Sequence, residues 1–259
     1  MIKEYSPSEL IEALNVVARV GILMLQSGAS SFRAKDIMDR IAAKLAIEQL
    51  DTFVTPTKMI VIVNNGQANY TRAFKVPSLG VNMARVSALE VLSRAMADST
   101  SPAELTKLVD EIEQRAPEYP RFVVIGAVAI ACGAFAVILG GGLPEFATAT
   151  CAAAVAQWLR FRMIALRLSP YLIAATCSAI AATISFGLVH LLNAPLPHLG
   201  LIASVLLLVP GVPLVTAILD FMHFDFISGM ARSIFAALIL VNIGIGMLVV
   251  LVLTGFSIL

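Results

Sequence analysis

The residues with the clearest potential for chemistry are two prolines and a glycine inside an apolar stretch. Val209-Pro210-Gly211-Val212-Pro213 lies in the middle of Leu199–Leu219, a segment long and apolar enough to cross a bilayer. Proline lacks a backbone N–H and clashes with the preceding turn, so this run predicts a helix that is broken at the middle of the membrane. Backbone groups freed in this way coordinate substrates or ions in many secondary transporters. The alternative is a packing kink whose freed groups bond to neighbouring helices.

Polar side chains extend this candidate site. Pro213, Thr216 and Asp220 fall at i, i+3 and i+7, on one stripe that leads from the break toward one end of the helix. Asp220 is therefore a candidate proton or cation site, with a carboxylate in the interfacial zone as the alternative. Gln157 and Asn242 lie in other apolar segments, where hydrogen bonding between helices is an equally good explanation. The predicted substrate-binding residues are Pro210, Gly211, Pro213, Thr216, Asp220, Gln157 and Asn242.

No residue pattern indicates an enzyme, a metal or another cofactor. The N-terminal part has no phosphate-binding glycine loop, no Gly-x-Ser-x-Gly and no His-Glu-x-x-His. Cys132, Cys151 and Cys177 lack the spacing of metal ligands. A net charge of +1 argues against a nucleic-acid partner, because neutralising phosphates requires a basic face.

Hydropathy predicts the helices that must position these residues. The chain is 59% hydrophobic and 14% charged, well below the roughly 25% charged residues of a soluble domain. Most charged residues precede Arg121, and the apolar segments after it predict about five transmembrane helices. These segments are Phe122–Leu139, Phe146–Leu159, Tyr171–Leu192, Leu199–Leu219 and Ser233–Leu259. The second segment is short, so a re-entrant or interfacial piece is its alternative.

The distribution of Lys and Arg predicts the orientation of these helices. Arg115 and Arg121 precede the first segment, a group of arginines separates the second from the third, and Arg232 precedes the fifth. That group consists of Arg160, Arg162 and Arg167. The remaining loops contain no Lys or Arg, so the positive-inside rule places the N-terminal domain in the cytoplasm and the C-terminus outside.

Residues 1–120 predict a cytoplasmic α/β domain that precedes a transmembrane domain of residues 121–259. Helical periodicity over Ser8–Leu25 and over residues 30–47 predicts two amphipathic helices. Three strands rich in β-branched and aromatic residues follow, at Thr52–Thr55, Met59–Val63 and Tyr70–Val76, with Asn64-Asn65-Gly66-Gln67 as a hairpin turn. Two more helices, at about Val81–Ala97 and Ala103–Ala116, complete the domain.

Several of these stretches together resemble the threonine/serine exporter (ThrE-like) family. They are Leu23–Ala29, Thr71-Arg72 with Gly80-Val81-Asn82 beyond it, and above all Ala203–Leu214 followed by Asp220 and Gly229-Met230-Ala231-Arg232. The resemblance covers essentially the whole chain, and its most specific part is the Pro-Gly-x-Pro stretch. The length of the chain matches the larger, YjjP-type subunit of the split form of the family.

The resemblance implies a bacterial inner-membrane exporter of small polar metabolites, either threonine and serine or succinate and related dicarboxylates. It also implies a smaller membrane subunit as a partner that supplies further spans, with a homo-oligomer of this chain as the alternative. Export would be driven by an ion gradient, because the sequence has no ATP-binding motif. The rival function is a membrane-anchored sensor or scaffold whose soluble domain binds a ligand or partner. A plain anchor has no need of a double-proline break, so that feature favours the exporter.

Overall fold

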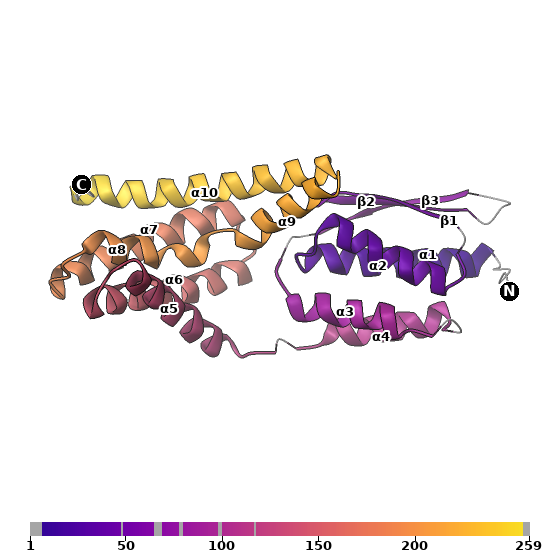
Figure 1. The fold of residues 1–259 in the computed structure, drawn as a ribbon, viewed down its shortest axis with the longest axis horizontal. Helices are drawn as coiled ribbons and strands as arrows, with labels where there is room; N and C mark the ends of the chain where they lie inside the picture. Colours follow the sequence, from indigo (N-terminus) through magenta and orange to yellow (C-terminus); the bar gives the residue numbers. More distant parts are fainter. Residues whose placement is uncertain are drawn as a thin grey trace. The chain divides into compact units, whose positions relative to one another are not determined.

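The computed structural model describes residues 7–47, 49–64, 69–77, 80–97, 100–116 and 118–255, which form two compact units (Figure 1). The first, here called the N-terminal unit, contains the residues up to Ala116 together with Gly211–Ile234. The second, the helical unit, contains Pro117–Pro210 and the residues from Phe235 onward. A segment from the apolar half of the chain therefore belongs to the N-terminal unit.

The N-terminal unit has three layers. α1 (Pro7–Gln26) and α2 (Ser31–Lys44) form the middle layer, with the sheet on one side and α3 (Met83–Ala95) and α4 (Pro102–Gln114) on the other (Figure 1). These helices match the predicted amphipathic segments because their apolar stripes are buried in one core. α4 begins as its sequence predicts: the Ser101 hydroxyl accepts a hydrogen bond from the Glu104 amide at 3.2 Å.

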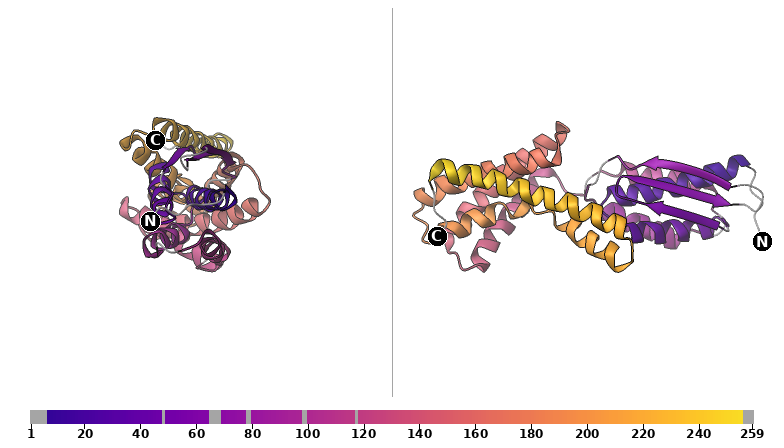
Figure 2. Two further views of the ribbon diagram at one scale, coloured as in Figure 1. Left: turned by 90° about the vertical axis from the view of Figure 1, so that its right-hand side faces the viewer. Right: turned by 90° about the horizontal axis from the view of Figure 1, so that it is seen from above.

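The sheet is antiparallel throughout, in the order β1-β2-β3. β1 (Gln49–Val54), β2 (Lys58–Asn64) and β3 (Asn69–Lys75) lie over the first two helices, as the view from above shows (Figure 2). The alternate side chains of the central strand, Met59, Val61 and Val63, are fully buried. Asn64 pairs with Asn69, which confirms the predicted hairpin, although residues 65–68 of its turn lie outside the described residues.

In the described part of the chain, the predicted apolar segments are mostly helical, and their bounds shift; residues 256–259 of the fifth segment lie outside the described residues. The helical unit contains α5 (Arg121–Ile138), α6 (Leu143–Ala165), α7 (Pro170–Leu191), α8 (Pro197–Ser204), the short 3₁₀ helix η1 (Leu206–Leu208) and most of α10 (Phe226–Thr254). α6 is longer than the predicted segment, with 23 residues, and α10 begins before Ser233. α10 can start early because no residue before Ser233 breaks the helix after Phe226.

By length and composition, three helices of the described part of the chain could cross a membrane: α5, α7 and α10. The count rises to four if α8 with η1 and the following α9 (Gly211–Met222) form one broken span. By the same measures of length and composition, α6 is not among these helices. The chain is thus a largely helical polytopic membrane protein, and the fifth span stays a prediction.

Glycine allows α10 and α7 to approach closely in the helical unit. A Cβ added at Gly246 would collide with the Ser178 hydroxyl and with the Ala175 carbonyl oxygen, whereas nothing lies within 4 Å of a Cβ added at Gly244. We expect Gly246→Ala to destabilise the protein by about 1–3 kcal/mol, because a backbone oxygen cannot move away without shifting α7. Thermal unfolding of the purified protein in detergent would measure this, with Gly244→Ala as the control. Equal midpoints for the two variants would contradict the packing described here.

Candidate functional site

The double-proline run separates two helices. η1 ends at Leu208, and α9 begins at Gly211, directly after Pro210. Pro213 lies in the first turn of α9, where an N–H would have no partner within the helix, so the second proline is accommodated without a further break. The predicted broken helix is confirmed, and its depth in a membrane stays a prediction.

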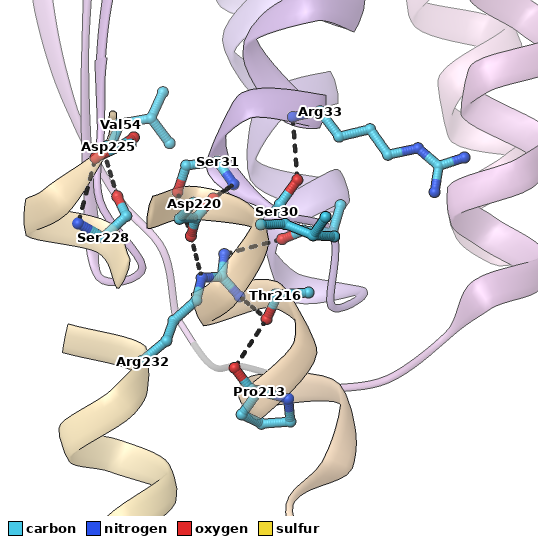
Figure 3. A network of polar contacts seen from close by, with 12 residues as sticks. Ser30, Ser31, Arg33, Val54, Pro213, Thr216, Asp220, Asp225, Ser228 and Arg232 are labelled. Carbon is cyan, nitrogen blue, oxygen red and sulfur yellow. Dashed lines mark hydrogen bonds and ion pairs between the residues drawn. The ribbon is translucent and has the colours of Figure 1, made fainter. Parts of the chain in front are cut away.

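The segment after the break forms a helical hairpin that belongs to the N-terminal unit. We call Gly211–Ile234 the docking hairpin; it consists of α9, a short turn and the first turns of α10. Its centre is an ion pair between Asp220 of α9 and Arg232 of α10, in which Arg232 Nε lies 2.9 Å from Asp220 Oδ2 (Figure 3). The two side chains are 0% and 3% exposed. A pair so completely removed from water needs further hydrogen bonds to offset its desolvation.

Asp220 finds such a bond at the N-terminus of α2. The Ser31 amide donates to Asp220 Oδ1 at 2.8 Å, and the Ser31 hydroxyl lies 3.5 Å from Oδ2 (Figure 3). The preceding Ser30 is the N-cap, and its hydroxyl accepts from the Arg33 amide at 3.3 Å. A carboxylate at this position satisfies an amide that the helix leaves free and complements the positive end of the helix dipole.

Arg232 completes the network on the other side. Its Nη1 donates to the Thr216 hydroxyl at 3.2 Å and its Nη2 to the Ala29 carbonyl at 2.8 Å (Figure 3). Ala29 ends the turn between α1 and α2, where Gly28 has a φ of +90° that favours glycine. The Gly80 amide donates to the Gln26 carbonyl at 2.8 Å, which brings a distant segment to this turn.

Two further contacts fasten the hairpin near its turn. The Ser228 hydroxyl donates to the carbonyl of Val54, the last residue of β1, at 3.0 Å (Figure 3). The rings of Phe32 and His223 stack with their centroids 3.7 Å apart. The hairpin thus contacts both α2 and the end of β1. Each charged group of the central pair is held by protein partners, and the arrangement can fix the hairpin to the N-terminal domain.

The structure brings together only some of the predicted site residues. Thr216 and Asp220 meet at Arg232 in the N-terminal unit, whereas Gln157 and Asn242 belong to the helical unit. Asn242 donates to the Leu238 carbonyl of its own helix at 2.8 Å, so it does not join two helices through this bond. Gln157 is 5% exposed, and its amide oxygen has no hydrogen-bond partner among the described residues.

The similarity of this chain to known proteins identifies its family. The model of the ThrE family, described as threonine/serine exporters, matches residues 15–254. The chain belongs to the threonine/serine exporter family. All the stretches that carried the resemblance lie within this match. Their hydrogen bonds meet in one region, which includes the turn before α2, Gly80, Asp220 and Arg232. A function in transport across a membrane follows from this membership.

Individual members of the family are similar over different lengths. The chain is 25% identical to the protein named probable succinate transporter subunit YjjP of Klebsiella aerogenes, over 96% of both chains. It is 27% identical to the protein of the same name from Escherichia coli K12, over 91% of this chain and 92% of the other. A threonine/serine exporter of Corynebacterium glutamicum is 27% identical over 52% of this chain and 28% of its own length. No solved structure matches.

The sequence interpretation missed the partners that define this exporter's polar centre. Neither the pairing of Asp220 with Arg232 nor its bond to Ser31 was predicted, although two opposite charges in apolar surroundings are a signal that they pair. Glu145 falls between the predicted apolar segments Phe122–Leu139 and Phe146–Leu159 and was not predicted as a site residue. It lies in the first turn of α6 and is fully buried, where its carboxylate accepts from the Gly142 amide at 2.7 Å and the Leu196 amide at 2.8 Å.

Breaking the buried pair should loosen the docking hairpin. We expect Asp220→Asn and Arg232→Met each to destabilise the N-terminal unit by about 3–5 kcal/mol, because each leaves a buried group without its partner. The combined variant should be less destabilised than the sum of the two. Thermal unfolding followed by circular dichroism, with hydrogen exchange at the first turn of α2, would measure the effect.

The control for this experiment is an exposed pair on α2, the helix whose N-terminus Asp220 contacts. Asp36 and Arg40 lie 2.5 Å apart at the surface of α2, so Asp36→Asn should cost less than about 1 kcal/mol. If Asp220→Asn cost no more than this control, the central role of the pair would be refuted.

Proposed function

We propose that the chain is the larger subunit of a secondary exporter in the bacterial inner membrane. The cargo would be a small polar metabolite that carries a carboxylate, either a threonine- or serine-type amino acid or a succinate-type dicarboxylate. The observation that carries this proposal is the near-complete match to two proteins named as succinate transporter subunits, at 96% and 92% of their lengths. The relative named as a threonine/serine exporter supports the amino-acid alternative, over a shorter stretch.

We propose further that a smaller membrane subunit completes the transporter. The word "subunit" in the names of the first two relatives supports this. The threonine/serine exporter relative supports it independently, because the match covers only 28% of that protein, which leaves room for a second set of helices in the single-chain form. An ion gradient would drive export, since the chain has no ATP-binding motif.

In the membrane, α6 would act as the additional span, giving five. Its 23 residues correspond to about 35 Å, enough to cross the hydrocarbon core of a bilayer. Arg162 in the last turn of α6 and Arg167 after it then lie on the cytoplasmic side, in agreement with Arg121 at the start of α5. The N-terminus would be cytoplasmic and the C-terminus periplasmic.

The predicted site residues divide into two roles under this proposal. Gln157 and the break at Pro210 and Gly211 would line the pathway, because an amide oxygen without a partner and an interrupted helix both offer groups to a ligand. Thr216, Asp220 and Pro213 would act through the docking hairpin, which joins the N-terminal domain to the helices on either side of it in the chain. Asn242 would contribute to the pathway only if its bond to α10 opened.

Transport should require both subunits. When the chain is co-expressed with a smaller membrane subunit of the same family, inverted membrane vesicles should accumulate labelled succinate or threonine in the presence of a proton or sodium gradient. Vesicles with either subunit alone should show little uptake. Full uptake with this chain alone would favour the homo-oligomer. No uptake of either metabolite by the pair would refute the proposed function and favour a sensor or scaffold.

Reporter fusions would test the proposed topology. Fusions after Gly142, Ala194 and Leu259 should report the periplasm, and fusions after Arg162 and Phe226 the cytoplasm, because the cations lie on one side. Each site would be fused both to alkaline phosphatase, which is active in the periplasm, and to a fluorescent protein that fluoresces in the cytoplasm. The two reporters should give opposite signals at every site, so each is the control for the other. A cytoplasmic C-terminus would eliminate the five-span arrangement.

A further inference from the structure

The helical unit contains an arginine whose charge has no carboxylate partner among the described residues. Arg160 lies on α6, five residues before its end, and its Nη1 donates to the Leu207 carbonyl at a long 3.4 Å. Arg232, which is buried, has Asp220 as a counter-ion. In the described part of the chain, Arg160 therefore retains N–H donors without a protein partner and a charge without a counter-ion.

The guanidinium of Arg160 is half-buried and reaches η1, a segment that contacts α5, α7 and α8. Arginines near a helix end ordinarily extend to the interface, whereas Arg160 bonds to the carbonyl of Leu207, close to the break in the helix.

A second group without a partner lies next to this arginine. Gln157 precedes Arg160 by one helical turn, and side chains three residues apart are neighbours on a helix surface. Helical side chains tilt toward the N-terminus, so the guanidinium of Arg160 lies over the turn that carries Gln157. The amide oxygen of Gln157 is buried and accepts no hydrogen bond in the described part of the chain.

Together these groups are complementary to one end of a small carboxylic acid. A guanidinium binds a carboxylate through two parallel charge-assisted hydrogen bonds. An amide oxygen beside it accepts a hydrogen bond from an ammonium or hydroxyl group on the adjacent carbon. Leu207, which holds Arg160 in place, is only two residues before the break at Val209–Pro210. Binding at this point would therefore act directly on the interrupted helix.

We propose that Arg160 binds the carboxylate of the exported metabolite, with Gln157 accepting from a neighbouring polar group. The proposal rests on the proposed function and names the group that recognises the cargo. Ionisable residues inside a membrane domain generally mark a substrate or ion pathway, and a ligand carboxylate supplies the counter-charge that Arg160 lacks.

The test uses the two-subunit transporter in inverted vesicles, with labelled succinate and threonine as probes. Arg160→Gln should lower kcat/KM for the transported acid by at least about tenfold, because the carboxylate loses its charged partner. The matched control is Arg162→Gln, two residues away, whose guanidinium lies over the ring of Trp158 at 5.7 Å; this variant should stay within about twofold of wild type. Immunoblots of the vesicles would correct for abundance.

Competition with modified acids gives a second readout that does not depend on the variant folding. Unlabelled succinate should inhibit uptake by the wild-type transporter far more strongly than its diamide, and threonine more strongly than its methyl ester. Arg160→Gln and the milder Arg160→Lys should reduce this preference. No transport by the wild type would refute the proposed function itself. Normal wild-type transport without any preference for the free acid, or an unchanged KM in Arg160→Gln, would overturn this inference alone.

Discussion

The buried ion pair between Asp220 and Arg232 is the interaction that holds the docking hairpin in the N-terminal unit. It gathers the first turn of α2, the turn before it and the two arms of the docking hairpin around one buried centre. Removing two charges from water is unfavourable, and it is tolerated here because the carboxylate caps a helix and the guanidinium bonds to Thr216 and Ala29. The chain crosses between the two units at Ala116, Pro210 and Ile234, and the hairpin occupies the stretch between the last two crossings. The centre therefore lies on the stretch of chain that leads through α9 into α10.

Two arginines of the family member, Arg232 and Arg160, illustrate how context assigns different roles to the same side chain. Arg232 is buried, lies beside a carboxylate and donates to a hydroxyl and a carbonyl. Arg160 has a single long bond to a carbonyl. A paired arginine stabilises a defined arrangement, whereas an arginine without a counter-ion in a membrane domain commonly marks a substrate or ion pathway. The structure therefore separates a group that holds the protein together from a group that is available to a ligand.

Local patterns were enough to predict the helices, the antiparallel strands and the broken helix at Pro210, because periodicity and proline act over a few residues. The same patterns identified Asp220 and Gln157 as polar residues within apolar segments. They did not reveal that Asp220 is bonded to Ser31, since that contact joins residues 189 positions apart. The same limit explains why neither Arg160 nor Arg232 was predicted as a site residue. Charge counting records which residues are basic, whereas the direction of a side chain depends on packing between helices that are distant in sequence.

The distance in sequence between Ser31 and Asp220 also has a consequence for biosynthesis. The ribosome makes α1 to α4 first, and domains generally begin to fold as they emerge. The first turn of α2 nevertheless lacks its carboxylate acceptor until 189 further residues have been made, after α5 to α8 have been synthesised. The N-terminal domain therefore reaches its final state only once most of the membrane helices have been synthesised. A chain that stalls or misinserts before Gly211 leaves this amide exposed, which gives cellular quality control a means of distinguishing unfinished molecules from complete ones.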